Sequence, residues 1–137
     1  MKDTVLLYNI DEEKVKKIKR VLLLLGMRAK NVTADMYEEK LGVLAGMMTK
    51  EQAQDAKCSI EPEKVDISEE TSPFTDEMLV MCGFSNARVD SFLMEMRKKK
   101  IERINLKAVL TPYNALWNSY EIHRELEKEH KAMHGES

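Results

Sequence analysis

Residues Glu77–Phe84 read EMLVMCGF, and an earlier stretch, Thr4–Ile10, reads TVLLYNI in the same manner. Both runs are apolar and too short for a typical helix, which is the pattern of a buried β-strand. A residue that commonly begins helices follows each run, Asp11 after the first and Ser85 after the second. The two stretches therefore predict two buried strands, each followed directly by a helix.

The first half continues with alternating strand and helix signals. The helix after Asp11 has apolar residues at helical spacing, and Gly26 is expected to end it by taking positive φ. A weak strand over 28–34 and a second helix from Asp35 follow. That helix has an apolar stripe, which with the ten methionines of the chain indicates a protein-contact surface, such as that of a homodimer. The stripe consists of Tyr37, Leu41, Leu44 and Met48.

The second half repeats this plan. After Ser85 the sequence predicts a helix, then a strand over 105–110, then a last helix over 119–133. A constant offset of 74 residues pairs Val5 with Leu79, and Val32 with Leu106, without a gap. This register indicates an internal duplication of a β-α-β-α unit.

One domain made of two halves is expected, with units at 1–48 and 77–137. Residues 49–76 are polar and acidic and are interpreted as a linker or a lid. Within the α/β (α+β) class, interleaving the two units in an antiparallel sheet gives a ferredoxin-like two-layer sandwich with extra helices. The long linker favours this arrangement. The alternative is a small four-stranded parallel doubly-wound sheet, which the helix after each second strand favours.

Composition narrows the class of protein. The formal net charge of −2 gives no global attraction for nucleic acid. Cys58 and Cys82 form no CxxC pair, so free thiols and a reducing, cytoplasmic location of the bacterial type are expected, with Cys82 in the core. The longest apolar run, 21–25, is far too short to cross a membrane. No phosphate-binding glycine loop or serine elbow occurs, so no cofactor and no catalytic residue is predicted.

The stretch Leu110–His130, LTPYNALWNSYEIHRELEKEH, contains the only tryptophan. Asn118 and Glu121 have the spacing of a capping box, and Trp117 and Ile122 that of a hydrophobic staple, so much of the stretch is interpreted as the start of a helix. The functional alternative is a ligand pocket, because residues after the carboxyl end of a strand often bind ligands in α/β sheets. Its candidate residues are Thr111, Tyr113, Asn114 and Trp117.

This stretch also resembles a small bacterial family, the domain of unknown function 3783. The matching residues are Lys107–Thr111, Asn114, Trp117, Glu129 and His130, and the resemblance covers about 77–133. It implies no activity, since the family has none assigned. The first half departs from the pattern, because Lys40 and Val43 stand opposite Asn114 and Trp117 at the repeat offset.

Two further patterns suggest sites. His123, Glu127, His130 and His134 share one helix face, but only an adjacent pair such as His130 and His134 is close enough to hold one metal ion. Lysines and arginines cluster on the first helix of each half and suggest an anion or RNA surface. The clusters are Lys14, Lys16, Lys17, Lys19 and Arg20, and Arg97, Lys98, Lys99, Lys100 and Arg103.

The sequence favours a non-enzymatic α/β protein that binds a protein partner or a small ligand. One alternative is an enzyme or metal protein that uses the end of the chain bearing Thr111, Asn114, Trp117 and His123. The other alternative is nucleic-acid binding through the basic helices, against which the negative net charge argues.

Overall fold

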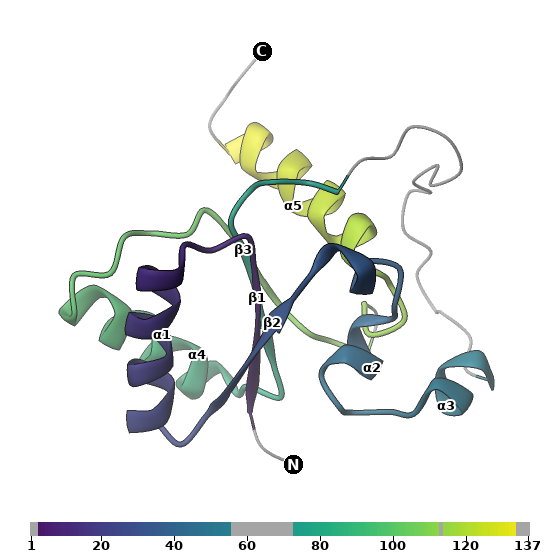
Figure 1. Ribbon diagram of the computed structural model, residues 1–137, viewed down its shortest axis with the longest axis horizontal. Coiled ribbons are helices and arrows are strands. Elements are labelled where there is room, and N and C mark those ends of the chain that lie inside the picture. Colours follow the sequence, from purple (N-terminus) through teal and green to yellow (C-terminus); the bar gives the residue numbers. More distant parts are fainter. Residues whose placement is uncertain (1–2, 56–72, 113, 134–137) are drawn as a thin grey trace.

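The computed structural model describes residues 3–55, 73–112 and 114–133 (Figure 1). The first half contains β1 (Thr4–Tyr8), α1 (Glu12–Leu24), β2 (Arg28–Val32), the 3-10 helix η1 (Ala34–Met36), α2 (Leu41–Leu44) and α3 (Lys50–Asp55). The second half contains β3 (Met78–Cys82), α4 (Asn86–Lys98), β4 (Leu106–Val109) and α5 (Ser119–Met133). The two predicted caps are confirmed, since Asp11 accepts from the Glu13 amide and Ser85 from the Arg88 amide.

All four strands form one mixed sheet in the order β2-β1-β3-β4. β1 pairs with β2 in parallel, and β3 pairs with β4 in parallel. The two halves meet where β1 pairs with β3 in antiparallel orientation, with Leu6 opposite Val80. The carboxyl ends of β1 and β2 therefore lie at one edge of the sheet, and those of β3 and β4 at the other.

This order corrects both expectations for the sheet, while the α/β class holds. The ferredoxin-like arrangement is wrong because each half keeps its own two strands adjacent and parallel instead of interleaving them with the other half. The all-parallel alternative is wrong because β1 and β3 run in opposite directions. The apolar pattern of a buried strand is the same in all three arrangements, and so it did not distinguish them.

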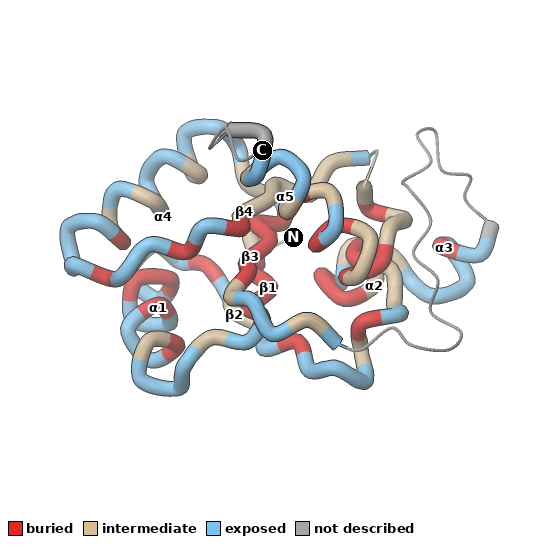
Figure 2. The backbone as a smooth tube through the Cα atoms, turned by 90° about the horizontal axis from the view of Figure 1, so that it is seen from above, coloured by how far each residue is buried: buried red, intermediate tan, exposed pale blue. Residues whose placement is uncertain are grey.

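Helices cover both faces of the sheet, which gives three layers (Figure 2). α1 and α4 lie on one face, where Ile18 and Phe92 pack against Val5 and Leu79. α2 and α5 lie on the other face, where Leu41 and Ile122 pack against Leu6 and Val80. β1 and β3 are buried along their whole length because helices cover both of their faces. Cys82 is fully buried in β3, as predicted.

The two halves are superposable in sequence over their first strand and helix. β1 and α1 begin 74 residues before β3 and α4. The residues with positive φ follow the same offset, because Asn9 corresponds to Gly83 and Gly26 to Lys100. The gapless register fails after that point, since Leu106 occupies the place of Arg28 and not that of Val32. The loop before β4 is four residues longer than the loop before β2.

The predicted helix from Asp35 is interrupted. Lys40 is extended and forms an isolated bridge with Asn118, so the segment divides into η1 and the short α2. Its stripe is not a contact surface, since Tyr37, Leu41 and Leu44 are buried in the core. The region interpreted as a linker contains α3, and its residues 56–72, with Cys58, lie outside the described residues.

Candidate functional site

A crevice lies at the carboxyl ends of β1 and β2. The chain leaves β1 into α1 on one face of the sheet, and it leaves β2 into η1 and α2 on the opposite face. Two adjacent parallel strands whose connections diverge in this way leave a gap outside the strand ends, which is the usual ligand site of open α/β sheets. The sequence therefore builds a preferred binding position in its first half.

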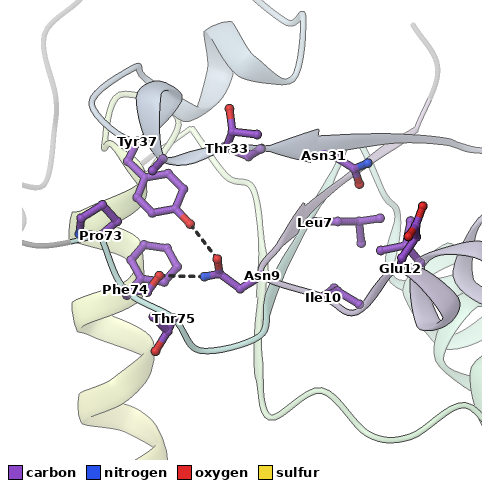
Figure 3. A pocket seen from close by; sticks show the side chains of 13 residues that line it. Leu7, Asn9, Ile10, Glu12, Asn31, Thr33, Tyr37, Pro73, Phe74 and Thr75 are labelled. Carbon is purple, nitrogen blue, oxygen red and sulfur yellow. Dashed lines mark hydrogen bonds between the residues drawn. The ribbon is translucent and has the colours of Figure 1, made fainter.

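A pocket of about 510 Å³ occupies this crevice. We call it the strand-end pocket. Figure 3 shows the rings of Tyr37 and Phe74 on one side of Asn9, and Leu7, Ile10 and Glu12 on the other. The polar side chains that line it include Asn9, Glu12, Asn31, Thr33 and Thr75. A pocket of this size with an apolar wall and a few polar groups suits a small molecule.

Asn9 organises the wall of the pocket. It has positive φ directly after β1, a conformation that asparagine tolerates better than most residues. Its Nδ2 donates to the carbonyl oxygens of Phe74 at 2.8 Å and Asp76 at 3.1 Å. Its Oδ1 accepts from the Tyr37 hydroxyl at 3.3 Å (Figure 3). One side chain thus ties the segment before β3 to the segment after β2.

An aromatic cluster supports the same wall. The Phe74 ring stacks on Tyr37 at a centroid distance of 4.5 Å and on the His123 imidazole at 3.9 Å. Tyr8 lies against both Tyr37 and Phe74, with centroid distances of 5.7 Å. The Tyr8 hydroxyl bonds the Ser119 hydroxyl at 2.8 Å, and burial raises the pKa of Tyr8 far above its ordinary value. These contacts give the pocket a rigid aromatic side.

The charges around the pocket are acidic. Neither lysine nor arginine occurs among the described residues that line it. α1 begins here, and Asp11, Glu12 and Glu13 occupy its first turn, where they already satisfy the positive end of the helix. The Asp11 carboxylate accepts from the Glu13 amide at 3.2 Å. An anionic ligand would meet these carboxylates, so the pocket favours a neutral or cationic one.

A second polar cluster lies beyond Phe74 on the same edge of the sheet. His123 Nε2 is 2.8 Å from Asp76 Oδ2, and Glu127 is one helical turn further along α5. One donor atom from each of these three residues lies within 4.8 Å of the others, a spacing that can hold a metal ion. A smaller pocket of about 250 Å³ opens beside them.

The loop predicted as a ligand site lies at the opposite edge, after β4. The Asn114 side chain accepts from the Thr111 amide at 2.8 Å and donates to the Val109 carbonyl at 3.2 Å. The Asn114 amide in turn donates to the Thr111 hydroxyl at 3.3 Å. The structure brings Thr111 and Asn114 together in bonds that close the loop, and Tyr113 lies outside the described residues.

The rest of this loop joins the two halves. The carbonyl oxygens of Trp117 and Ala115 accept from the amides of Leu41 and Gly42, which begin α2 and have no partner within their helix. Trp117 is half-buried against the cluster that contains Ile122. Asn118 and Glu121 exchange side-chain to backbone bonds of 2.9 Å, so the capping box is confirmed. Thr111, Asn114 and Trp117 line none of the four pockets described, and a ligand there stays a prediction.

The other predicted sites are placed as follows. His123 lies beside Asp76 near the strand-end pocket, whereas Asn114 is bonded to the end of β4, so the structure separates these two members of one predicted constellation. His130 lines the smaller pocket, and His134 lies outside the described residues. The basic helices α1 and α4 share one face of the sheet. Three of their lysines pair with glutamates: Lys14 with Glu77, Lys16 with Glu13 and Lys98 with Glu95.

Sequence reasoning missed the strand-end pocket. The rule that placed a ligand after β4 applies equally after β1 and β2, and it would have selected Asn9, Asn31 and Thr33. Phe74 and Asp76 carried no comparable signal, because they fall in a segment that the composition marked only as a linker. Their proximity to Tyr37 and His123 depends on tertiary contacts between distant parts of the chain.

Comparisons with known proteins add one relationship. Within residues 3–55, 73–112 and 114–133, no helix has the length and apolar character needed to span a bilayer. Neither a search of curated proteins nor a search of solved structures returned a match. Residues 77–133, the second half of the chain, match the family model described as domain of unknown function (DUF3783), which is the family that the sequence resembles.

Proposed function

We propose that the protein binds a small molecule in the strand-end pocket and is not an enzyme. The observation that carries the proposal is the position of the pocket, in the crevice between parallel strands whose connections leave to opposite faces of the sheet. Hydrogen bonds of Asn9 and stacking of Phe74 hold its wall before any ligand arrives. A preformed wall lowers the entropic cost of binding.

The lining defines the chemical class of the ligand. Tyr37 and Phe74 provide flat apolar contact, and Asn31, Thr33 and Thr75 are exposed groups that can exchange hydrogen bonds. The Glu12 carboxylate and the acidic first turn of α1 favour a neutral or positively charged molecule over a phosphate or carboxylate. A planar heterocycle or an aromatic amine with hydrogen-bonding substituents meets these requirements.

Titration of the ¹⁵N-labelled full chain with adenosine, nicotinamide and tryptamine tests this function. Saturable amide shifts are expected at Asn31, Thr33 and Tyr37. Asn31→Ala removes one exposed amide and is expected to weaken binding by about 3- to 10-fold, which corresponds to one net hydrogen bond. Arg28→Ala, an exposed position at the other end of β2, is the matched control and should leave the affinity unchanged. Shifts that do not saturate, or that avoid this edge of the sheet, refute the proposal.

We further infer a homodimer contact on the layer of α1 and α4. Leu23, Leu24 and Met94 are large apolar side chains that are 80%, 65% and 58% exposed there. Apolar side chains of this kind are typical of contact surfaces. Light scattering across a concentration series tests the inference, and Leu23→Lys with Leu24→Lys should then abolish the dimer. A monomer at every concentration contradicts it.

We also infer that the two halves descend from one duplicated β-α-β unit within a single domain. The shared offset of β1 and α1 with β3 and α4 supports this origin, as does the correspondence of the positive-φ residues Asn9 with Gly83 and Gly26 with Lys100. A homologous chain consisting of one half alone, paired as a dimer through its first strand, would be the direct test.

A further inference from the structure

We propose that Asp76, His123 and Glu127 form a binding site for a divalent transition-metal ion, separate from the strand-end pocket. His123 and Glu127 are four residues apart on α5 and so project from the same face of the helix. Asp76 approaches them from the segment before β3. The three donors therefore come from two elements that are far apart in the sequence, as in many protein metal sites.

The distances are compatible with coordination. The three donor atoms all lie within 4.8 Å of one another, and the closest pair, His123 Nε2 and Asp76 Oδ2, is 2.8 Å apart. Ligands bound at about 2.0–2.2 Å from one ion lie roughly 3.0–3.5 Å from each other. The Glu127 carboxylate is half-buried on a flexible side chain, and a rotation of that side chain closes the remaining gap.

The imidazole is oriented before the metal binds. The Phe74 ring lies flat against it, at 3.9 Å and an interplanar angle of 7°, and His123 is only 8% exposed. Asn9 holds the backbone of both Phe74 and Asp76 through its Nδ2. A stacking partner and a hydrogen-bonded backbone around the ligands are the kind of outer support that raises metal affinity.

The charge and access of the site fit a cation. Even with the imidazole protonated, the two carboxylates leave the cluster with a net negative charge. The neighbouring Glu77 is not a further donor, because both of its carboxylate oxygens contact Lys14 Nζ, at 3.0 and 3.2 Å. The pocket of about 250 Å³ that Asp76 and Glu127 line gives an entry path from solvent. Lys131 lines the same pocket and is the cation with which a metal ion competes.

The donor set selects the class of ion. One imidazole nitrogen with two carboxylate oxygens suits Zn²⁺, Mn²⁺, Fe²⁺ or Co²⁺. Ca²⁺ and Mg²⁺ prefer sites built from oxygen alone. The inference does not depend on a ligand in the strand-end pocket, and it places the metal on the other side of Phe74.

Calorimetric titration of the full chain with Zn²⁺ tests the site. Wild-type protein is expected to bind one ion, and Glu127→Gln, which preserves shape and removes the charge, should weaken binding about tenfold or more. Glu129→Gln is the matched control, because Glu129 lies on the same helix but is exposed and outside the cluster. The imidazole nitrogen resonances of His123 should shift on metal binding in wild-type protein.

His130→Ala separates this site from a site formed by the histidines near the end of the chain. It should leave Zn²⁺ binding within a few-fold of wild type. The proposal is overturned by absence of binding at millimolar Zn²⁺, by equal affinity of Glu127→Gln and wild type, or by loss of binding in His130→Ala alone.

Discussion

The buried hydroxyl pair between Tyr8 and Ser119 links the first strand to the start of the last helix. The two oxygens are 2.8 Å apart, and both residues are 0% exposed. Tyr8→Phe keeps the ring and its aromatic contacts but leaves the Ser119 hydroxyl without this partner in an apolar setting. An unsatisfied buried hydroxyl costs about 1–3 kcal/mol, so the free energy of unfolding should fall by that amount.

The double variant gives the sharper result. Ser119→Ala alone strands the Tyr8 hydroxyl, whose raised pKa reports how strongly its surroundings disfavour a charge, and should also cost about 1–3 kcal/mol. In Tyr8→Phe with Ser119→Ala no buried group lacks a partner. Only the net hydrogen bond is lost, which is about 0.5–1.5 kcal/mol. The double variant should therefore be no less stable than the weaker of the two single variants.

Urea denaturation followed by the fluorescence of Trp117 measures all four proteins, since this is the only tryptophan in the chain. The slope of unfolding free energy against urea should be unchanged, which shows that the folded state keeps its extent of burial. Tyr120→Phe, a half-buried tyrosine in the same aromatic cluster, is the control and should cost under about 0.5 kcal/mol. Additive losses in the double variant refute the reasoning, because they mean that the two hydroxyls do not depend on each other.

Three further changes have defined outcomes. Asn118→Ala removes one arm of the capping box and should lower the unfolding free energy by about 1 kcal/mol in urea, while an unchanged midpoint contradicts the role of the cap. Lys100→Gly should stabilise the protein by about 1 kcal/mol, because Lys100 has φ 56° where its counterpart Gly26 is already glycine; a loss of thermal stability would contradict this. Burial raises the pKa of Cys82 from 9.0 to about 12, so above pH 9 the unfolded thiol ionises first and stability falls. Between pH 8 and pH 10 the deficit of Cys82→Ala relative to wild type should therefore shrink by about 1.4 kcal/mol, and a constant deficit in urea refutes it.

The local elements could be predicted from the sequence because their causes are local. The strands at Thr4–Tyr8 and Met78–Cys82, the caps at Asp11 and Ser85 and the capping box at Asn118 each depend on residues within a few positions of one another. Their signals are apolar runs and hydrogen-bonding side chains at fixed spacing. The internal offset of 74 residues was visible for the same reason, since it compares one local pattern with another.

The order of the strands could not be predicted, because it depends on contacts between halves. β1 and β3 are buried on both faces whichever neighbour each takes, so their apolar sequences specify burial but not partner. The bridge between Lys40 and Asn118 likewise interrupts a helix that the pattern from Asp35 predicted as continuous. The four extra residues before β4 were hidden because Val32 and Leu106 are both apolar and matched by chance.

The site illustrates the same limit from the other side. The prediction at Thr111 and Asn114 used a sound rule, that ligands bind after the carboxyl ends of strands, but applied it only to the half with the unusual residues. Tryptophan, proline and histidine attract attention because they are rare in the sequence. In the structure the Asn114 bonds close a loop, while the pocket in the first half is lined by the ordinary side chains Asn31 and Thr33.

The two halves have equivalent crevices with different uses. At the carboxyl end of β4, the loop of residues 111–118 turns its polar side chains onto its own backbone and offers the carbonyls of Ala115 and Trp117 to α2. At the carboxyl end of β2, the chain turns directly into η1 and leaves the crevice open. Gly42 makes the first arrangement possible, since a Cβ there would lie 2.7 Å from Met48 Cε and 3.2 Å from the Ala115 carbonyl. One copy of the repeated unit therefore spends its crevice on holding the halves together, and this is why the other copy is the one with a pocket free for a ligand.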